Sequence, residues 1–250
     1  DLMTERFGSM ATQNPQDKRL KFTHPGDAFW DLFRVGNQNR SSGNKEALWV
    51  IQYDVDVTGG QLLSIGTWAV TNTTRGEGAN VLERIAGPVA WMTFKDPTGA
   101  EGALGSPQSN YNSGGQGVSL MKNTEWWLND LWLSDWDNDI RNAPHNIVRD
   151  FVYNNPKSAY FDSSSVKYPS PTRIAQLWRW YAYPSKITTP GQHPAELITD
   201  TEKENLRATA GSTYRDNYMF RLAETYLLRA EAYLGKNDLE IGRASCRERV

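Results

Sequence analysis

Aromatic side chains set among amides are the residues of this sequence with the clearest chemistry. The run SNYNSGGQ, residues 109–116, places Tyr111 between two asparagines in a glycine-rich stretch. Flat rings pack against the C–H faces of sugar rings, and neighbouring amides hydrogen-bond to the sugar hydroxyls. We therefore predict a set of ligand-facing aromatics with amides at the rim: Trp68, Asn110, Tyr111, Asn112, Trp126, Trp136 and Trp180.

A tryptophan is also a common core residue, and the chain contains ten. Large aromatics are highly buried on average even where they are not fully buried. For Trp30, Trp49 and Trp132 the core interpretation is the stronger one, because these residues lie within predicted helices or strands. The candidates for ligand contact are those on loops or at the ends of elements.

An acidic loop, residues 135–139 with the sequence DWDND, resembles the start of a calcium-binding loop. The pattern then fails, because Ile140 stands where that loop needs glycine and Asn146 where it needs a bidentate glutamate. We expect Asp139 to pair with Arg141 or with a backbone donor, and we predict no metal site here.

Catalytic patterns are weak. His24, His145 and His193 are isolated, and no two have the spacing of a zinc-binding pair. The sequence has no G-x-S-x-G nucleophile motif and no phosphate-binding loop. A glycosidase needs two carboxylates at a fixed separation, and the 29 acidic residues cannot be sorted into such a pair by sequence alone. We predict a protein that is not an enzyme and that needs no cofactor.

The composition excludes some partners. The net charge is −2, so no basic surplus favours nucleic acid or an anionic membrane surface. Hydrophobic residues make up only 38% of the chain, which indicates abundant loops. No apolar run is long enough to span a membrane, and no export signal is present.

The local patterns predict short elements separated by long loops. Asp27 and Thr124 are typical helix N-caps, and Gly, Ser, Thr and Asn dominate residues 58–117. Trp178 and Trp180 are expected on one face of a strand, since side chains alternate along extended backbone. The predicted elements are helices at 28–33 and 125–133 and strands at 47–57 and 176–181.

The strongest periodicity is near the end of the chain, where residues 215–236 predict one amphipathic helix. Its apolar stripe recurs at steps of three and four, and Gly235 is expected to end it in the left-handed conformation. Asn237-Asp238 then indicates the cap of a second helix, so we expect the first half of a helix-turn-helix unit. The stripe residues are Phe220, Ala223, Leu227, Ala230 and Leu234.

Residues 240–250, EIGRASCRERV, lack any apolar period. Back-translated, they fit the read-through of a common short-read sequencing adapter. We therefore expect this tail not to be biological sequence and leave it out of the fold prediction. The only cysteine, Cys246, lies inside it, so we expect no disulfide and no thiolate metal site.

Three segments resemble the SusD/RagB family of surface lipoproteins from Bacteroidetes. The run RLAETYLLRAEA, residues 221–232, resembles the helix motif of that family. Residues 43–53, GNKEALWVIQY, resemble its N-x-E-x-I-x-x-x-Q strand, and Asp139-Ile140-Arg141 resembles its D-x-R element. The identifiable motifs cover a minority of residues 1–239.

The resemblance implies a mostly α fold of tetratricopeptide-type helices with long irregular loops and a few short strands. It implies that residues 1–239 are part of a single such domain with both ends missing, and that residues 58–200 form the ligand region. The implied function is non-catalytic binding of an oligosaccharide or other nutrient for a SusC-like TonB-dependent transporter. The implied location is the extracellular face of the outer membrane, reached through a lipid anchor outside this sequence.

Two other functions stay open from the residues alone. One is a hydrolase acting on glycans, which would release reducing ends from a polysaccharide. The other is a protein–protein scaffold without a glycan site, in which the aromatics would all be buried. Whether the ligand is a sugar or a peptide is also open.

Overall fold

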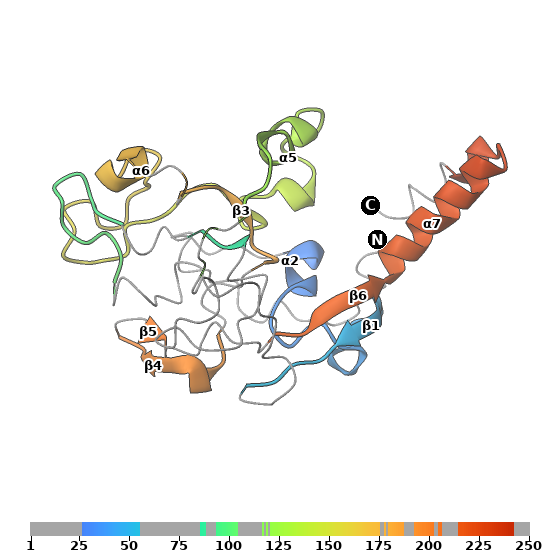
Figure 1. The fold of residues 1–250 in the computed structure, drawn as a ribbon, viewed down its shortest axis with the longest axis horizontal. Helices are drawn as coiled ribbons and strands as arrows, with labels where there is room; N and C mark the ends of the chain where they lie inside the picture. The colour runs from blue at the N-terminus through green and yellow to red at the C-terminus, as the bar shows by residue number, and fades with distance from the viewer. Residues whose placement is uncertain are drawn as a thin grey trace.

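The computed structural model describes residues 27–55, 86–88, 94–104, 117, 119, 121–175, 178, 180–187, 193–202, 205–206 and 215–242. Its elements are short apart from the last helix, which projects from the other described elements (Figure 1). In chain order they are α2 Ala28–Leu32, η2 Arg40–Ser42, β1 Ala47–Ile51, α5 Glu125–Leu128, η6 Asp130–Trp132, η7 Ile140–Asn142, β2 Ile147–Val148, α6 Pro171–Ala175, β3 Tyr183–Pro184, η9 Ala195–Leu197, β4 Ile198–Asp200, β5 Asn205–Leu206, β6 Asn217–Arg221 and α7 Leu222–Gly235.

Strands β1 and β6 form an antiparallel pair that joins two distant parts of the chain. The register places Val50 opposite Tyr218 and Ala47 opposite Arg221. The Tyr218 ring packs edge-on against Phe33 just after α2, at 5.7 Å between centroids. Its hydroxyl donates to the Leu32 carbonyl at 2.6 Å, so α2 is fastened to the sheet (Figure 1).

Asn44 is the polar centre of this junction. Its side chain is fully buried, yet its amide makes four hydrogen bonds. The Oδ1 atom accepts from the backbone N–H groups of Glu46 at 2.9 Å and Ala47 at 3.2 Å. The Nδ2 group donates to the Asn37 carbonyl at 3.0 Å and to the Tyr218 hydroxyl at 2.5 Å. Every donor and both acceptor sites of the amide are therefore used.

A second centre is an aromatic core. Strands β2 and β3 pair Val148 with Tyr183, and Phe94 stacks on Tyr153 at 4.6 Å between ring centroids. A buried set of mostly aromatic side chains fills the space between these segments: Phe94, Val148, Phe151, Tyr153, Trp180, Tyr181 and Tyr183. Such a core offsets the ordering entropy of the loops around it.

Asp96 connects two loops over this core. Its Oδ1 accepts from the Thr98 backbone and hydroxyl at 2.8 and 2.6 Å, and its Oδ2 accepts from the Ser158 hydroxyl at 2.7 Å. Burial alone would raise the pKa of Asp96. These hydrogen bonds and one from the Ala100 backbone have the larger, opposite effect, so the pKa is lowered to about 2. The carboxylate is therefore a charged structural link rather than a proton donor.

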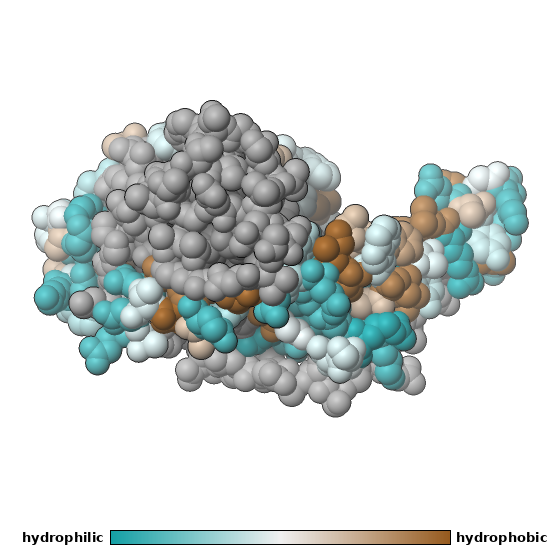
Figure 2. All heavy atoms as spheres, turned by 60° about the horizontal axis from the view of Figure 1, so that its bottom comes forward, coloured by the Kyte–Doolittle hydropathy of each residue, from teal (hydrophilic) through white to brown (hydrophobic). Residues whose placement is uncertain are grey.

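The predicted helix at 215–236 is wrong in its first third. Residues 217–221 are strand β6, because Tyr218 and Phe220 pair with β1, and the helix begins only at Leu222. The apolar stripe is also not covered within the described residues. Leu227 and Leu234 are 41% and 61% exposed, whereas Ala230 is buried. In Figure 2 the projecting arm shows scattered hydrophobic side chains among hydrophilic ones.

The end of α7 differs from the prediction by two residues. Gly235 is helical, and Asn237 has the left-handed φ of 59°. The Asp238 N–H donates to the Tyr233 carbonyl and the Asn237 N–H to the Leu234 carbonyl, both at 2.9 Å, which is a Schellman ending. Residues 239–242 are helical, and the Asp238 carboxylate accepts from the Ile241 N–H at 3.2 Å. Asp238 therefore caps a helical turn as predicted, but three of the four residues of this turn belong to the tail 240–250 that the fold prediction left out.

The mostly α fold of tetratricopeptide type is wrong. Helices α2, α5 and α6 have five, four and five residues, and α7 has fourteen. They accompany three two-stranded antiparallel sheets in the described part of the chain, which is therefore weakly mixed α and β. A helical repeat needs several long apolar stripes, and among the described segments only α7 carries one.

The local predictions fared unevenly. The caps are confirmed, because Asp27 accepts from the Trp30 N–H at 2.7 Å and Thr124 from the Trp127 N–H at 3.2 Å. The strand at 47–57 exists but ends at Ile51. The core positions of Trp30 and Trp132 are confirmed, while that of Trp49 is wrong, since its side chain is 62% exposed.

Within the residues described, no helix is both long and apolar enough to cross a membrane.

Replacing Asn44 by alanine tests the junction. Asn44→Ala leaves the N–H groups of Glu46 and Ala47 without their partner, and we expect a loss of about 3 kcal/mol in the free energy of unfolding. The matched control is the exposed Asn129, whose side-chain amide donates to Glu125 Oε2 at 3.3 Å. The free energy of unfolding of both variants is measured by urea denaturation, and that of Asn129→Ala should change by less than about 0.5 kcal/mol. Equal effects of the two substitutions would contradict the role of Asn44.

The raised pKa of Asp31 predicts that the stability of the fold depends on pH. Burial raises its pKa from 3.8 to about 6 despite the attraction of Arg34. The folded state therefore binds a proton more tightly than the unfolded chain, and stability falls as the pH rises from about 4 to 6. Asp31→Asn should remove a decline of about 2 to 3 kcal/mol over this window. Urea midpoints at several pH values measure it, with the exposed Asp130→Asn as control; an unchanged decline in Asp31→Asn would refute the assignment.

Candidate functional site

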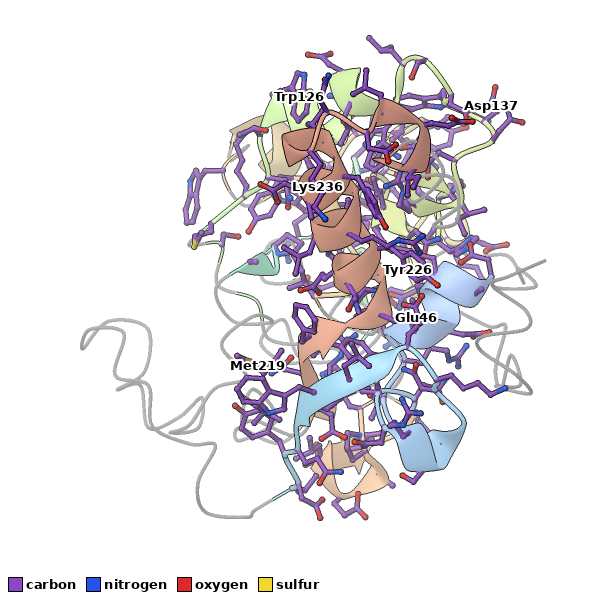
Figure 3. All side chains as sticks on the ribbon, turned by 90° about the vertical axis from the view of Figure 1, so that its right-hand side faces the viewer. Glu46, Trp126, Asp137, Met219, Tyr226 and Lys236 are labelled. Carbon is purple, nitrogen blue, oxygen red and sulfur yellow. The ribbon has the colours of Figure 1, made fainter. Side chains whose placement is uncertain are left out.

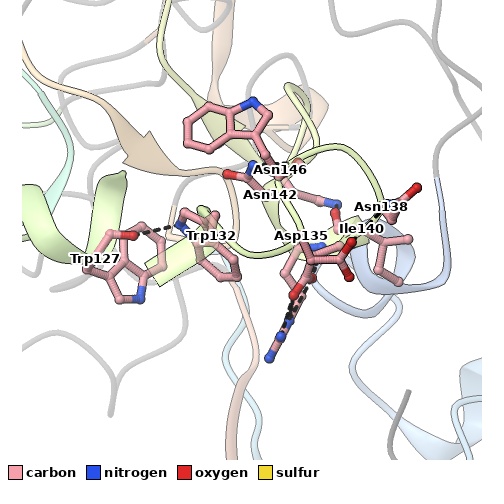
Figure 4. A network of polar contacts seen from close by, with 10 residues as sticks. Trp127, Trp132, Asp135, Asn138, Ile140, Asn142 and Asn146 are labelled. Atoms are coloured by element: carbon pink, nitrogen blue, oxygen red, sulfur yellow. Dashed lines mark hydrogen bonds and ion pairs between the residues drawn. The ribbon is translucent and has the colours of Figure 1, made fainter. Parts of the chain in front are cut away.

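The segment from residue 121 to 149 carries two exposed tryptophans on a compact set of turns. Thr124 caps α5, and the backbone leaves the helix at Asn129 to form η6. The buried Trp132 donates its indole N–H to the Trp127 carbonyl at 2.7 Å and packs edge-on against that ring at 5.8 Å (Figure 4). The turns are therefore fixed by one tryptophan that faces inward.

Trp136 follows these turns and lies against a cation. The guanidinium carbon of Arg149 is 4.8 Å from the centroid of the Trp136 ring. The Asn142 side chain donates to the Trp136 carbonyl at 2.8 Å and also accepts from Arg149. We call Trp136, Asn142 and Arg149 together the Trp136 platform. An indole held at its backbone and against its ring keeps one orientation, although 41% of the side chain is exposed.

Arg149 joins the platform to the rest of the segment. Its guanidinium donates to the Leu128 carbonyl at 2.6 Å and to the Asn142 side-chain oxygen at 2.5 Å. Burial lowers the pKa of Arg149, but an arginine keeps its charge throughout the ordinary pH range. The cation can therefore stabilise the electron-rich face of the indole at any physiological pH.

The acidic loop beside the platform is arranged by Asp139. Its carboxylate accepts from the Arg141 backbone N–H at 3.0 Å and from Arg141 Nε at 2.8 Å, as predicted. The Arg141 hydrogen bond holds the pKa of Asp139 below its usual value. Within the described residues, no group of three or more His, Cys, Asp or Glu side chains is placed to hold a metal ion.

Trp126, on α5, is the second exposed indole of the segment, with 58% of its surface accessible (Figure 3). An aromatic ring that is exposed yet carried on fixed backbone can take an apolar ring face without first being ordered. Asn138 bonds to Asp135 at 2.9 Å, and both side chains are exposed beside Trp136 in the sequence. The chemistry that these side chains offer is stacking with polar contacts.

The structure places only some of the predicted ligand-facing residues. Trp126 and Trp136 are exposed and belong to the same segment. Trp180 is 4% exposed, and its ring packs edge-on against Phe94 at 5.0 Å and Phe151 at 5.2 Å. That position does not fit a ligand-facing role. The remaining predicted residues lie outside the described part of the chain: Trp68, Asn110, Tyr111 and Asn112.

The burial of Trp180 also corrects the strand predicted at 176–181. Trp178 is 55% exposed, so the two tryptophans do not share a face. Trp178 lies in a 3-10 turn and Trp180 in irregular backbone, and side chains alternate by two only where the backbone is extended.

Sequence reasoning missed the two residues that hold Trp136. Arg149 is thirteen positions away along the chain, beyond any local pattern, and reaches the ring because η7 and β2 turn the backbone back. The sequence offered a general signal for Asn142, since asparagines commonly bond to nearby backbone groups at turns.

The two arginines of the segment provide a test of the platform. Arg149→Met removes hydrogen bonds to Leu128 and Asn142, and we expect the free energy of unfolding to fall by about 2 kcal/mol. Arg141→Met is the control: its half-exposed guanidinium pairs with Asp139 and lies 5.4 Å from the centroid of the Trp132 ring, and we expect these contacts to be worth less than about 1 kcal/mol. Urea denaturation followed by circular dichroism measures both. A larger loss in Arg141→Met would show that the platform does not depend on Arg149.

No protein-family model, no curated protein and no solved structure matches this chain. The resemblance to SusD/RagB therefore rests on its three sequence segments. The structure brings two of these together: Arg221, which opens the helix motif, lies 3.7 Å from the buried Glu46 carboxylate of the strand motif. The Leu222 N–H also donates to the Glu46 carbonyl at 2.9 Å.

Proposed function

We propose that this chain is a non-catalytic binding protein for an oligosaccharide or a similar nutrient. The observation that carries the proposal is the Trp136 platform, an exposed indole fixed by Arg149 and Asn142. Sugar rings bind by placing their C–H faces on such rings, with the hydroxyls satisfied by amides and carboxylates at the rim. Trp126 and Asn138 are a second exposed ring and an exposed amide within residues 121–149.

The resemblance to SusD/RagB gives the proposal its biological setting. The protein would act on the extracellular face of the outer membrane, held by a lipid anchor outside this sequence. It would pass its ligand to a SusC-like TonB-dependent transporter. The contact of Glu46 with Arg221 joins two of the three segments that carry the resemblance.

Exposed aromatics favour binding over a scaffold whose aromatic side chains are all buried. Trp49, Trp126, Trp136 and Trp178 are each more than two-fifths exposed. Single exposed apolar residues are ordinary, but a tryptophan held in place by specific polar contacts, as Trp136 is, indicates a use for its exposed ring.

The proposal is tested by native gel electrophoresis of the chain in gels that contain starch, xylan, pectin or β-glucan. A binding protein migrates more slowly in one of these gels than in a gel without polysaccharide. A parallel assay for new reducing ends separates binding from hydrolysis. Retardation without release supports the proposal, whereas release of reducing ends, or no retardation in any gel of a broad panel, contradicts it.

Replacing Trp136 by alanine should weaken the retarding interaction by about tenfold, because an aromatic contact is worth about 1 to 1.5 kcal/mol. The control is Trp49→Ala, which removes an indole on β1, outside the segment, that is more exposed than Trp136 (62% against 41%). Dissociation constants come from migration at a series of polysaccharide concentrations. Equal losses in the two variants would show that the Trp136 platform is not the binding surface.

A further inference from the structure

A cavity of about 400 Å³ lies away from the Trp136 platform, between the segment after α2, the end of β1, η9 and the start of β6. Its size falls within the range of small-ligand sites. The described residues that line it come from these four places: Val35, Gly36, Tyr53, Asp54, Val55, Pro194, Glu196 and Asp216.

The apolar part of the cavity wall is firmly packed. Val35 and Val55 pack against the buried pair Leu197 and Leu206, which sit on η9 and β5. With Pro194 they give the cavity an apolar side. A ligand that enters therefore meets a surface able to cover hydrocarbon.

The polar part of the wall is acidic. Asp54, Glu196 and Asp216 line the cavity together with Tyr53, and no lysine, arginine or histidine is among the described lining residues. Asp216 is held in place, because its Oδ1 accepts from the Tyr53 N–H at 2.8 Å and its Oδ2 accepts from Asn39. A carboxylate fixed in this way needs no further ordering to meet a cation.

The three carboxylates do not form a metal site. They are among the described residues, in which no group of three or more such side chains is placed around an ion. The charge is instead spread around a cavity that also has an aromatic ring and an apolar wall. Ammonium groups on a carbon skeleton match this combination, through carboxylates, cation–π contact and hydrocarbon packing together.

We propose that this cavity, lined by Tyr53, Asp54, Glu196 and Asp216, binds a small organic cation with an ammonium group and an apolar body. The ammonium lies between the carboxylates and the Tyr53 ring, and the apolar body packs on Val35, Val55 and Pro194. The site is independent of the Trp136 platform and of the function proposed for it.

Benzylamine is the probe, because at neutral pH it carries one ammonium on an aromatic body. Benzyl alcohol is its neutral counterpart, and calcium chloride tests the metal alternative. We expect calorimetric titration of the chain at low salt to give binding of benzylamine that is about tenfold tighter than that of benzyl alcohol. Trp136→Ala should bind benzylamine as the unaltered chain does.

Two substitutions locate the site. Glu196→Gln and Tyr53→Leu should each weaken benzylamine binding by about threefold or more, since each removes one part of the cation contact. Glu202→Gln is the matched control, because Glu202 is exposed nearby in the chain and does not line the cavity. Glu196 is exposed, so its substitution keeps the test valid if Tyr53→Leu does not fold. Absent or equal binding of both probes, binding of calcium alone, or equal loss in Glu202→Gln would overturn the proposal.

Discussion

The pairing of β1 with β6 around the buried amide of Asn44 is the constraint on which most of the described structure depends. Asn44 directs the chain into β1 by holding two backbone N–H groups, and it reaches Tyr218 on the facing strand. Tyr218 in turn fixes the end of α2 through the Leu32 carbonyl. A buried amide with all its partners specifies one arrangement, because any slip of the strands would leave polar groups unpaired.

The segment that carries Trp136, residues 121–149, is joined to this junction by a second set of polar contacts. Asn146 donates to the Asp27 carboxylate at 2.9 Å and to the Ile140 carbonyl at 2.6 Å. Asp27 is also the N-cap of α2, and His145 pairs with it at 2.5 Å. The cap of one short helix therefore positions the loop that carries Trp136. A stacking surface built on short turns needs such anchors, since helices of four or five residues are not stable alone.

Features decided by neighbouring residues were predictable from the sequence, and those decided by distant contacts were not. The caps at Asp27 and Thr124, the pairing of Asp139 with Arg141 and the second-helix cap at Asp238 all depend on residues a few positions apart. The conversion of residues 217–221 from helix to strand depends on β1, which lies far away in the sequence. The burial of Trp180 depends on Phe94 and Phe151 in the same way. Trp136 could be predicted as a ligand-facing residue because it is an aromatic residue in a loop. Its contact with Arg149 could not be predicted.

The long separation of β1 and β6 has a consequence for how the chain is made. Asn44 and Tyr218 are 174 residues apart, so β1 leaves the ribosome long before its partner has been synthesised. During that interval the strand presents Leu48, Trp49 and Val50 beside unpaired backbone groups, which is the kind of edge that associates with other chains. Closure of this sheet is therefore a late event of biosynthesis, because it must wait until residues 217–221 have been synthesised.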